Sequence, residues 1–407
     1  MTTSHESARH TVHINNVSFN SDKSFFTVCM EEGLRVYRTD TLELYQSLSS
    51  RVCGSVGLSE QLDDSCAVVM TGASSRNKIA ANEAMLYNFV TNQFGGCFKM
   101  PRNILNVLIR SDKLVLVTAT EVQVYDVSLF PLDKAERGVS YSTTSNPLGL
   151  CQMSRDHAVR HVLCIPGSVV GSLSIMELSG DGGCRVMPGM RGLIKAHDGS
   201  LQCLRLSCDG RMIATASDKG TLIRLWCTQR YNKLMEFRRG SDPARIYDID
   251  MSADNAFLAV VSDKKTAHVF AIKNSRLNTT SNGFSALALN SSYTDPLRRM
   301  SYFYLHGLVD CKIAIKPNGS VYVVTKDGRY YKHLLQRDGG EQVCRRLAYD
   351  VYSDLSLEFS NPDQSHTQQA PPATTTATGD GGLAADCLTG LDIVDDVYDA
   401  ADDIILA

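Results

Sequence analysis

Long apolar runs are absent from this 407-residue chain. None approaches the ~18 to 20 residues needed to cross a bilayer, so we expect no transmembrane span. Residues 1–11 are polar and contain no apolar stretch, so they are not expected to form a signal peptide. Any contact with a membrane is therefore expected to be peripheral.

Disulfide and zinc-binding patterns are also missing. The 13 cysteines are odd in number and include no C-x-x-C pair. This usage is typical of reduced, buried thiols in the cytosol and argues against a disulfide framework or a zinc site. We expect a cytoplasmic protein without a metal or a cofactor.

Catalytic signatures are absent as well. The sequence has no G-x-x-x-x-G-K-[ST], H-E-x-x-H or G-x-S-x-G motif. The glycine cluster at residues 180–183 lies in a turn-like context with no helix after it, which argues against a nucleotide site. An enzyme is not favoured, and no nucleic-acid partner is expected.

Basic residues stop before the end of the chain. Residues 361–407 hold nine acidic residues and no Lys or Arg, so residues 1–360 carry 41 basic against 35 acidic residues. From Ser360 onward the sequence is of low complexity and cannot bury enough apolar surface to order itself, so we predict a disordered acidic tail over residues 360–407. Its last part, residues 388–406, mixes acids with apolar residues, which leaves two alternatives: a solvated tail or a short helix on a partner.

An internal repeat is the strongest positive feature. Residues 206–221 and 251–266 match at seven of sixteen positions when the chain is shifted by 45 residues. The matched pairs are Ser207/Ser252, Asp209/Asp254, Ala214/Ala259, Ser217/Ser262, Asp218/Asp263, Lys219/Lys264 and Thr221/Thr266. A period of roughly 40 to 45 residues is the blade length of β-propellers of the WD40 kind.

The repeating unit consists of short strands separated by turns. Units of this type occupy residues 14–39, 105–126 and 311–335, where β-branched and aromatic runs alternate with Asp, Asn, Gly and Ser turns. Five glycines stand where a tight hairpin asks for positive φ, namely Gly33, Gly210, Gly220, Gly319 and Gly328. The pattern indicates antiparallel strands.

Further units near residues 55–100 and 148–178 bring the count to seven blades in about 345 residues. We therefore predict an all-β, WD40-like, seven-bladed β-propeller over residues 12–355, because closure into a ring removes exposed strand edges. Three stretches interrupt the rhythm and are expected to be loops within blades: residues 73–83, 129–146 and 273–299. A monomer is expected.

Two neighbouring arginines lie between the matched repeats, in Phe237-Arg238-Arg239-Gly240. In an extended strand successive side chains point to opposite faces, so Arg238 and Arg239 must diverge. One strand would then supply two separate sites.

The flanking repeats provide each arginine with a similar polar set. The set before the pair is His197, Ser217, Thr221 and Arg224, and the set after it is Ser262, Thr266 and His268. These groups are typical of an anion site, because Arg forms charge-assisted bonds to phosphate and Ser and Thr add neutral donors. We expect no carboxylate within either set, and imidazole charge only near the reference pKa of ~6.5.

Structural roles are the alternative for each of these residues taken singly. The Ser-Asp pairs of both repeats could form turns, His197 could be the structural histidine that WD repeats use to bond a buried Asp, and the arginines could form a solvated rim. The doubling of the pattern around one Arg-Arg pair favours two binding sites.

With these motifs, the sequence resembles the PROPPINs, the seven-bladed phosphoinositide-binding propellers that include the WIPI proteins. The resemblance rests on Phe237-Arg238-Arg239-Gly240 together with residues 214–226 before it and residues 246–270 after it. It extends over about residues 12–350 in repeat layout. The resemblance assigns Arg238 and Arg239 to two separate headgroup pockets, each with its flanking set.

The same resemblance implies the ligand and the cellular role. It implies binding of phosphatidylinositol 3-phosphate (PI3P) and phosphatidylinositol 3,5-bisphosphate (PI(3,5)P2), with autophagy or trafficking proteins as further partners. The expected function is a membrane-recruited scaffold at phagophore, endosomal or vacuolar/lysosomal membranes. The alternative is a WD-type protein-protein interaction hub without lipid binding, in which the arginines meet an acidic peptide.

The resemblance also implies that residues 273–299, within the sixth blade, form a membrane-facing loop. Phe284, Leu287 and Leu289 are the expected membrane-inserting residues, and Arg276, Arg298 and Arg299 flank this apolar group. Packing of the apolar group against the propeller is the alternative.

Overall fold

A computed structural model of the chain describes residues 13–63, 65–74, 77–127, 135–155, 158–178, 192–278, 296–307, 309–338 and 341–352. The chain divides into two units, Met1–Ser360 and Asn361–Ala407, and every described residue belongs to the first. The expected acidic tail over residues 360–407 lies outside the described residues.

Seven sheets form the described part of the chain, and their strands pair antiparallel except for one short added strand, which is described below. Blades one to three contain β1 (Ile14–Phe19), β2 (Phe25–Met30), β3 (Gly33–Arg38) and β4 (Leu44–Ser49); β5 (Val56–Gln61), β6 (Ala67–Gly72), β7 (Glu83–Asn88) and β8 (Gln93–Lys99); and β9 (Asn106–Ile109), β10 (Lys113–Val117), β11 (Glu121–Val127) and β12 (Ala135–Ser142). Blades four and five contain β13 (Gln152–Met153), β14 (Val162–Pro166), β15 (Ser172–Glu177) and β16 (Gly192–Lys195); and β17 (Leu201–Leu206), β18 (Met212–Ser217), β19 (Leu222–Cys227) and β20 (Lys233–Arg238).

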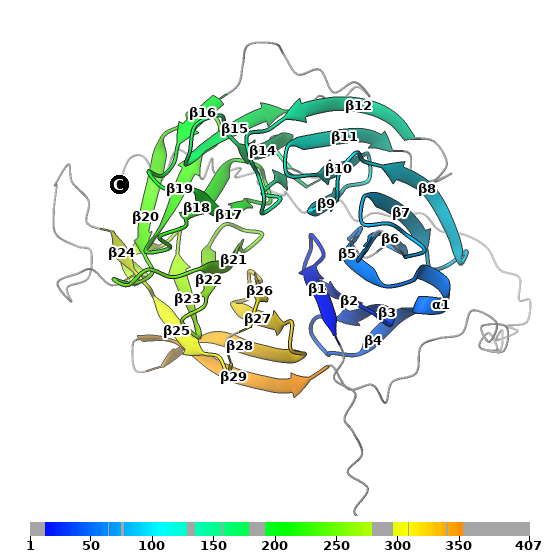
Figure 1. Ribbon diagram of the computed structural model, residues 1–407. Coiled ribbons are helices and arrows are strands. Elements are labelled where there is room, and N and C mark those ends of the chain that lie inside the picture. The colour runs from blue at the N-terminus through cyan, green and yellow to red at the C-terminus, as the bar shows by residue number, and fades with distance from the viewer. Residues whose placement is uncertain are drawn as a thin grey trace, which may run out of the picture. The chain divides into compact units, whose positions relative to one another are not determined.

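Blade six contains β21 (Ile246–Met251), β22 (Phe257–Ser262), β23 (Thr266–Ala271) and β25 (Ser301–Tyr304), and blade seven contains β26 (Cys311–Ile315), β27 (Ser320–Thr325), β28 (Arg329–Asp338) and β29 (Glu341–Val351). Figure 1 shows the blades arranged in a ring, with the first strand of each blade nearest the central channel. The predicted seven-bladed β-propeller is therefore confirmed. One short helix, α1 (Ser50–Cys53), and a 3₁₀ turn, η1 (Ser275–Leu277), complete the described elements.

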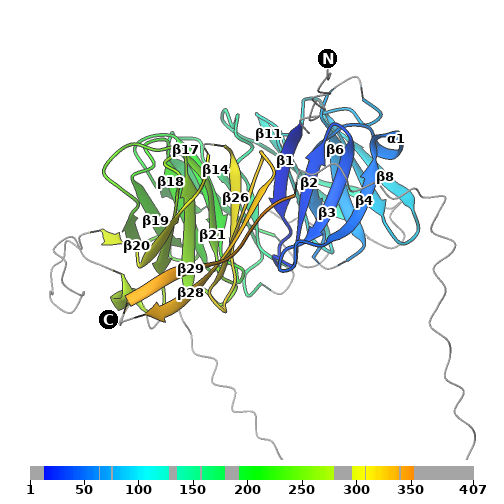
Figure 2. The same cartoon turned by 90° about the horizontal axis from the view of Figure 1, so that it is seen from below.

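The buried pattern of the inner strands follows from this arrangement. Strands such as β2 and β6 are buried at every position, because a blade packs against a neighbouring blade on both faces. The outermost strands, such as β8 and β29, are mostly exposed. Figure 2 shows the strands from the side, stacked from the channel outward.

The fourth strand of each blade is the main feature that the sequence analysis missed. Residues 129–146 were expected to be a loop, but they contain β12, which pairs with β11 from Glu121↔Ser142 to Val127↔Ala135. That expectation was wrong because an outer strand needs little apolar sequence: backbone pairing to one neighbour holds it, and its other edge faces outward.

All five glycines expected at tight turns have positive φ. Gly220, between β18 and β19, has φ +59°, and a Cβ atom there would lie 1.8 Å from the carbonyl oxygen of Ala244. Glycine is therefore required at this turn on steric grounds as well as for its backbone conformation. The turn matters because the Gly220 carbonyl faces one of the two candidate sites described below.

The ring closes between blade one and blade seven through side chains. Each blade is built from one continuous stretch apart from its insertions, so no strand is shared between the first and last blades. Instead, a buried cluster joins Val17, Phe26 and Tyr37 to residues of β27 and β28. Tyr330 Oη donates a hydrogen bond to the Thr39 carbonyl at 2.7 Å, and Tyr37 Oη donates one to the Tyr352 carbonyl at 3.2 Å.

The insertion at residues 273–299 ends in a strand that belongs to another blade. It leaves blade six after β23 and returns as β24 (Leu297–Arg298), which pairs in parallel with β20, as Phe237↔Leu297 and Arg238↔Arg298. Blade five therefore has a fifth strand (Figure 1). The sequence analysis, which expected only a loop, did not foresee this pairing, because two residues are too few to show a strand pattern.

The closure predicts a specific loss of stability. Replacing Tyr330 by Phe removes the donor to the buried Thr39 carbonyl, and should lower the free energy of unfolding by about 1 to 3 kcal/mol. Tyr349→Phe is the matched control, since its ring is 43% exposed on β29. Urea unfolding curves that are identical for Tyr330→Phe and the unaltered protein would contradict this account of closure.

Candidate functional site

Phe237 fixes the orientation of the strand that carries both arginines. Its side chain is fully buried in the cluster between blades five and six, with its ring centroid 5.0 Å from that of Phe270. Ile223, its partner on β19, belongs to the same cluster. Phe237 therefore points towards blade six.

Arg238 lies on the opposite face of the sheet, towards blade four. It pairs with Leu222, in the same alternating row of β19 as Arg224 and Trp226, and Trp226 packs against the cluster between blades four and five. Among the described residues, the Arg238 guanidinium has no hydrogen bond or ion pair. This side chain is partly exposed at the rim of the propeller.

Arg239 turns towards blade six, beside the turn that contains Gly220. Its Nε donates to the Gly220 carbonyl at 2.9 Å and its Nη2 donates to the Asp242 carbonyl. The side chain is 6% exposed, and burial lowers its pKa, opposed by Asp263 and Asp242. The two arginines thus diverge into different interfaces between blades, as the alternation of a strand requires.

His197 is held by a hydrogen-bond chain on the blade-four side. Its Nε2 lies 2.8 Å from Thr215 Oγ1, which also accepts a hydrogen bond from Trp226 Nε1 at 3.0 Å. Asp218, the nearest candidate for the buried Asp of a WD repeat, is exposed. His197 therefore forms a hydrogen bond within the fold, but with Thr215 and not with a buried Asp.

Arg224 lies on the same face as Arg238 and is already paired. Its Nε donates to Glu236 Oε2 at 2.7 Å, and its Nη1 donates to the Ala196 carbonyl at 2.7 Å. Lys233 Nζ also lies 3.3 Å from Glu236. The expectation that no carboxylate would lie in the set was wrong, because Glu236 is opposite Arg224 in the register of β19 and β20.

The remaining members of the first set divide between the two arginines. Ser217, at the end of β18, is 8% exposed and continues the row of Thr215 on the blade-four side. Thr221 is 6% exposed, and its carbonyl accepts a hydrogen bond from the Arg239 amide at 2.9 Å. The backbone of Thr221 is thus opposite Arg239, although the sequence analysis grouped this residue with Arg238.

The second set converges on the interface between blades five and six. Ser262 and His268 lie in rows that include Val260 and Phe270, which pack against Phe237. Thr266 Oγ1 lies 3.0 Å from His268 Nε2. His268 Nδ1 is buried and has no hydrogen-bond partner among the described residues.

Three residues near the second set were not assigned to it from the sequence. Burial lowers the pKa of the Arg239 guanidinium, and Asp263 lies close enough to oppose this lowering, which is a second exception to the expected absence of carboxylates. Tyr302 and Tyr304 on β25 pair with His268 and Thr266, and their side chains are 40% and 69% exposed. The only sequence signal for the tyrosines was their spacing of two around Phe303.

Both histidines are neutral near pH 7. Burial and then the nearby Arg224 guanidinium lower the pKa of His197 to about 4. Burial, then Arg299 and Arg239, lower the pKa of His268 to about 3. At neutral pH each imidazole therefore offers one donor and one acceptor, without charge.

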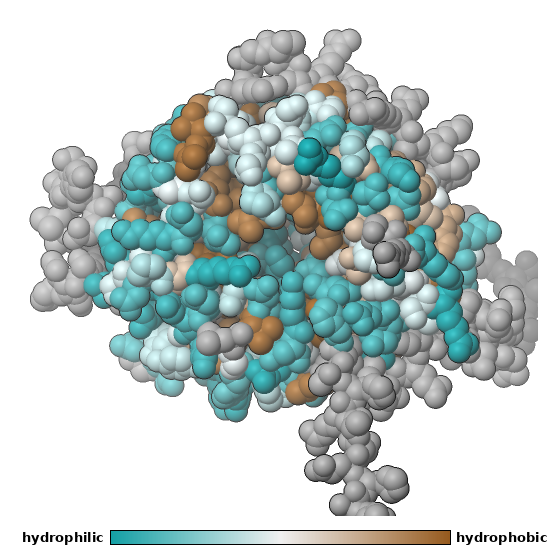
Figure 3. All heavy atoms as spheres, viewed as in Figure 1, coloured by the Kyte–Doolittle hydropathy of each residue, from teal (hydrophilic) through white to brown (hydrophobic). Residues whose placement is uncertain are grey.

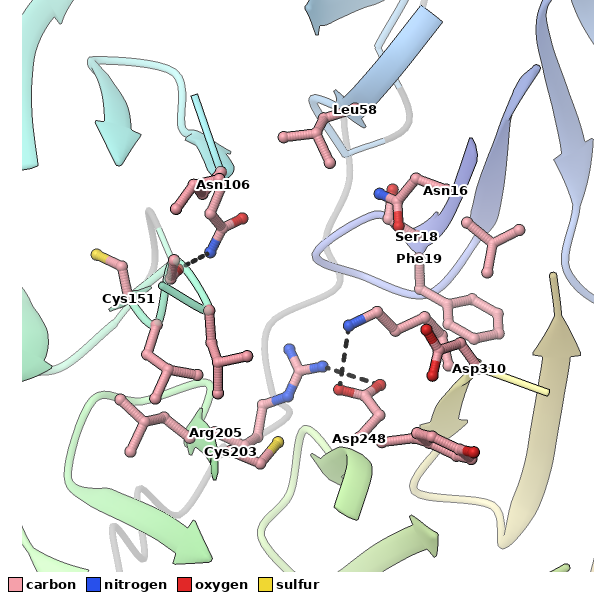
Figure 4. Close-up of a pocket in the computed structure, with 18 of the residues that line it drawn as sticks. Asn16, Ser18, Phe19, Leu58, Asn106, Cys151, Cys203, Arg205, Asp248 and Asp310 are labelled. Carbon is pink, nitrogen blue, oxygen red and sulfur yellow. Dashed lines mark hydrogen bonds and ion pairs between the residues drawn. The ribbon is translucent and has the colours of Figure 1, made fainter. Parts of the chain in front are cut away.

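The central channel contains a cavity of about 410 Å³. Its charged groups neutralise one another, because Asp248 lies 3.8 Å from Arg205 Nη2 and 3.6 Å from Lys312 Nζ (Figure 4). Asp250, on the same strand, lies 2.8 Å from Lys23 Nζ. Ile313 and Ile315 amides donate to the same two carboxylates. This network links the inner strands, and each described Lys or Arg that lines the cavity has a carboxylate within 4 Å.

The face seen along the channel is mainly hydrophilic, with separate apolar spots (Figure 3). Within the described ranges, no helix is long and apolar enough to span a membrane, and no group of His, Cys, Asp and Glu could hold a metal ion. The expected membrane-inserting residues Phe284, Leu287 and Leu289 lie outside the described residues.

Comparison with known proteins identifies relatives and a common fold. The sequence matches the PROPPIN family over residues 13–293. It is 32% identical to SVP1-like protein 2 of Neurospora crassa over 277 residues, which are 67% of this chain and 60% of that protein, so it spans less than two thirds of this relative. It is 31% identical to autophagy-related protein 18 of Dictyostelium discoideum, over 65% of this chain and 67% of that protein. Kluyveromyces lactis Hsv2 has a similar structure, with a TM-score of 0.67 and 21% identity over 84% of this chain and 99% of that one.

The buried histidines predict a loss of stability in acid. Their folded-state pKa values lie below the ordinary value of 6.5, so the unfolded chain binds more protons below that pH. Above pH 6.5 both histidines are neutral in the folded and the unfolded chain, and the free energy of unfolding keeps its full value. It falls as the pH decreases from 6.5 towards 4, and at pH 5 each histidine should lower it by on the order of 2 kcal/mol.

His197→Asn combined with His268→Asn should therefore flatten the pH dependence of the unfolding midpoint between pH 6.5 and 5. His333, whose pKa burial and Arg346 lower to about 4, remains in this variant, so part of the slope should persist. An unchanged slope would show that the imidazoles are already protonated in the folded protein.

Proposed function

This chain belongs to the PROPPIN family, an autophagy-related group of β-propellers, and from that premise we propose that it binds phosphoinositides at two sites on its rim. The ligands are the headgroups of PI3P and PI(3,5)P2, and the protein acts as a membrane-recruited scaffold in autophagy or in endosomal or vacuolar trafficking. The observation that carries the proposal is the divergence of Arg238 and Arg239 into two interfaces between blades.

The first site has an available cation. Arg238 is partly exposed and makes no ion pair with a described residue, while the nearest carboxylate on its face, Glu236, is bound by Arg224 and Lys233. A guanidinium in this state can form charge-assisted, bidentate bonds to a phosphate. Glu236 holds Arg224 in place, so we assign Arg224 a supporting role beside the phosphate.

The second site combines a buried guanidinium with an unused imidazole nitrogen. Arg239 is held by two carbonyls, which orient its fork while leaving its charge uncompensated by any described ion pair. Among the described residues His268 Nδ1 has no hydrogen-bond partner, and the Thr266 hydroxyl lies 3.0 Å from the other ring nitrogen, Nε2. A phosphate oxygen would satisfy this nitrogen as a hydrogen-bond acceptor if the imidazole carries its proton there.

Two neighbouring sites on one rim explain how shallow pockets could hold a membrane. Once one headgroup is bound, the second binding event is intramolecular, and avidity can exceed single-site affinity by about 10² to 10⁴. Both arginines come from adjacent positions of one strand end, so both sites can face one bilayer. The propeller would then stand edge-on, with its other blades free for protein partners.

Apolar and aromatic groups near the sites would add to this attachment. Phe284, Leu287 and Leu289 would each contribute on the order of 1.5 to 3 kcal/mol if fully inserted. Tyr302 and Tyr304, exposed beside the second set, have the amphipathic rings that favour the membrane interface. We propose a cytoplasmic protein recruited to phagophore, endosomal or vacuolar/lysosomal membranes, with autophagy or trafficking proteins as partners.

The lipid proposal predicts loss of membrane binding without loss of folding. Arg238→Thr combined with Arg239→Thr should abolish flotation with liposomes that contain PI3P, while thermal unfolding stays nearly unchanged. Each single variant should retain one site and weaken flotation by about 10² to 10⁴, the contribution of avidity.

The matched control is Arg345→Thr combined with Arg346→Thr, which removes the same charge from an exposed adjacent pair on β29. It should float like the unaltered protein. If both double variants lose flotation equally, the effect of the arginines is only one of general positive charge. If the Arg238/Arg239 variant still floats, the lipid proposal is wrong and the protein-protein interaction hub remains.

Membrane binding should also be nearly independent of pH between 7.5 and 6. At the reference pKa of ~6.5, assistance by protonated His197 and His268 would strengthen binding towards pH 6. Their pKa values of about 4 and 3 keep both rings neutral over this range. Flotation that rises several-fold between pH 7.5 and 6, and does so only when His268 is present, would show that bound phosphate protonates this ring.

A further inference from the structure

The insertion of blade six returns to the propeller with a second pair of adjacent arginines, Arg298 and Arg299. Leu297, just before this pair, packs against the cluster that buries Phe237. The segment Leu297-Arg298-Arg299 thus runs in parallel beside Phe237-Arg238-Arg239. An apolar residue of the same cluster, Phe237 or Leu297, precedes each pair and imposes the same alternation on both.

Arg298 lies directly beside Arg238. The two residues are register partners of β24 and β20, so their side chains leave the same face of the sheet, opposite Leu297 and Phe237. Both are at least partly exposed, and neither guanidinium has a hydrogen bond or ion pair with a described residue.

This juxtaposition is unfavourable unless an anion joins the two cations. Like charges directly opposite on neighbouring strands destabilise their pairing. Glu236 is on the same face, but Arg224 and Lys233 already bind its carboxylate. A phosphate bound between Arg238 and Arg298 would replace their mutual repulsion with one charge-assisted contact to each guanidinium.

Arg299 points to the other interface. Its guanidinium carbon lies 4.1 Å from the ring centroid of Tyr302, and Tyr302 is the register partner of His268. Arg299 is also close enough to His268 to help lower the pKa of that imidazole. It is therefore beside the site that Arg239 serves.

Arg299 would contribute to the second site mainly through its positive charge. Without Arg299, the guanidinium of Arg239 has the carboxylate of Asp263 near it, and the imidazole of His268 is neutral. Arg299 adds a second guanidinium beside this set.

We propose that Arg298 and Arg299 complete the two phosphate sites, Arg298 joining Arg238 in the first and Arg299 joining Arg239 in the second. The inference rests on the proposed function and assigns two further ligand residues to its sites. The insertion thereby supplies one arginine to each site, and phosphate binding fastens its return strand to blade five.

The test measures single-site affinity by calorimetry, with the full chain and water-soluble dibutanoyl PI3P. In the Arg239→Thr background only the first site remains, and there Arg298→Gln should weaken binding by about 10- to 100-fold while Arg299→Gln changes it less than threefold. In the Arg238→Thr background the two effects should exchange. Arg345→Gln, a charge-matched change on exposed β29, should have no effect in either background.

Inorganic phosphate serves as a second probe. If inorganic phosphate binds more weakly than dibutanoyl PI3P and shows the same exchange of effects, the assignment is supported and the favoured phosphate source is a lipid headgroup. If the two probes bind with equal affinity and show this exchange, the assignment is supported with free phosphate as the source. Equal losses from Arg298→Gln and Arg299→Gln in both backgrounds, or no loss in either, would overturn the assignment while leaving the two-site function intact. Absence of binding by the unaltered chain would instead remove the proposed function and this inference with it.

Discussion

The burial of Phe237 is the constraint on which the rest of the site depends. Its ring is fully buried between blades five and six against Phe270, so β20 cannot rotate about its axis without exposing it. Because successive residues of a strand face opposite sides, this one anchor sends Arg238 towards blade four and Arg239 towards blade six. Leu297 packs against the same cluster and orients the second arginine pair in the same way.

The arrangement places the residues of the proposed binding sites on the rim and a network of structural ion pairs in the channel. Inside the ring, Asp248 and Asp250 are paired with Arg205, Lys312 and Lys23 and accept backbone amides, so these charges connect the blades. At the rim, Arg239 is bound by two carbonyls, and Arg238 has no hydrogen bond or ion pair with a described residue. If such a site binds a phosphate weakly alone, as we propose, the pairing of two sites on one strand becomes functionally important.

Much of this could be predicted from the sequence, because turns and buried inner strands leave strong patterns. The seven blades, the five positive-φ glycines and the divergence of Arg238 and Arg239 all follow from periodicity. The outer strands, β12 and β24 among them, do not, since exposed strands are held by backbone pairing that apolar periodicity does not record. Side-chain partners such as Glu236 on Arg224, or Thr215 on His197, depend on register between strands, which one sequence does not fix.

The most direct test of the central claim is the stoichiometry of headgroup binding. Titration with dibutanoyl PI3P should give two sites per chain for the unaltered protein, one site for Arg238→Thr and one site for Arg239→Thr. Phe237→Ala, which removes the anchor, should disturb both sites together. A single site in the unaltered protein, or the loss of all binding on replacing either arginine alone, would contradict the account, because both results require the two side chains to share one pocket.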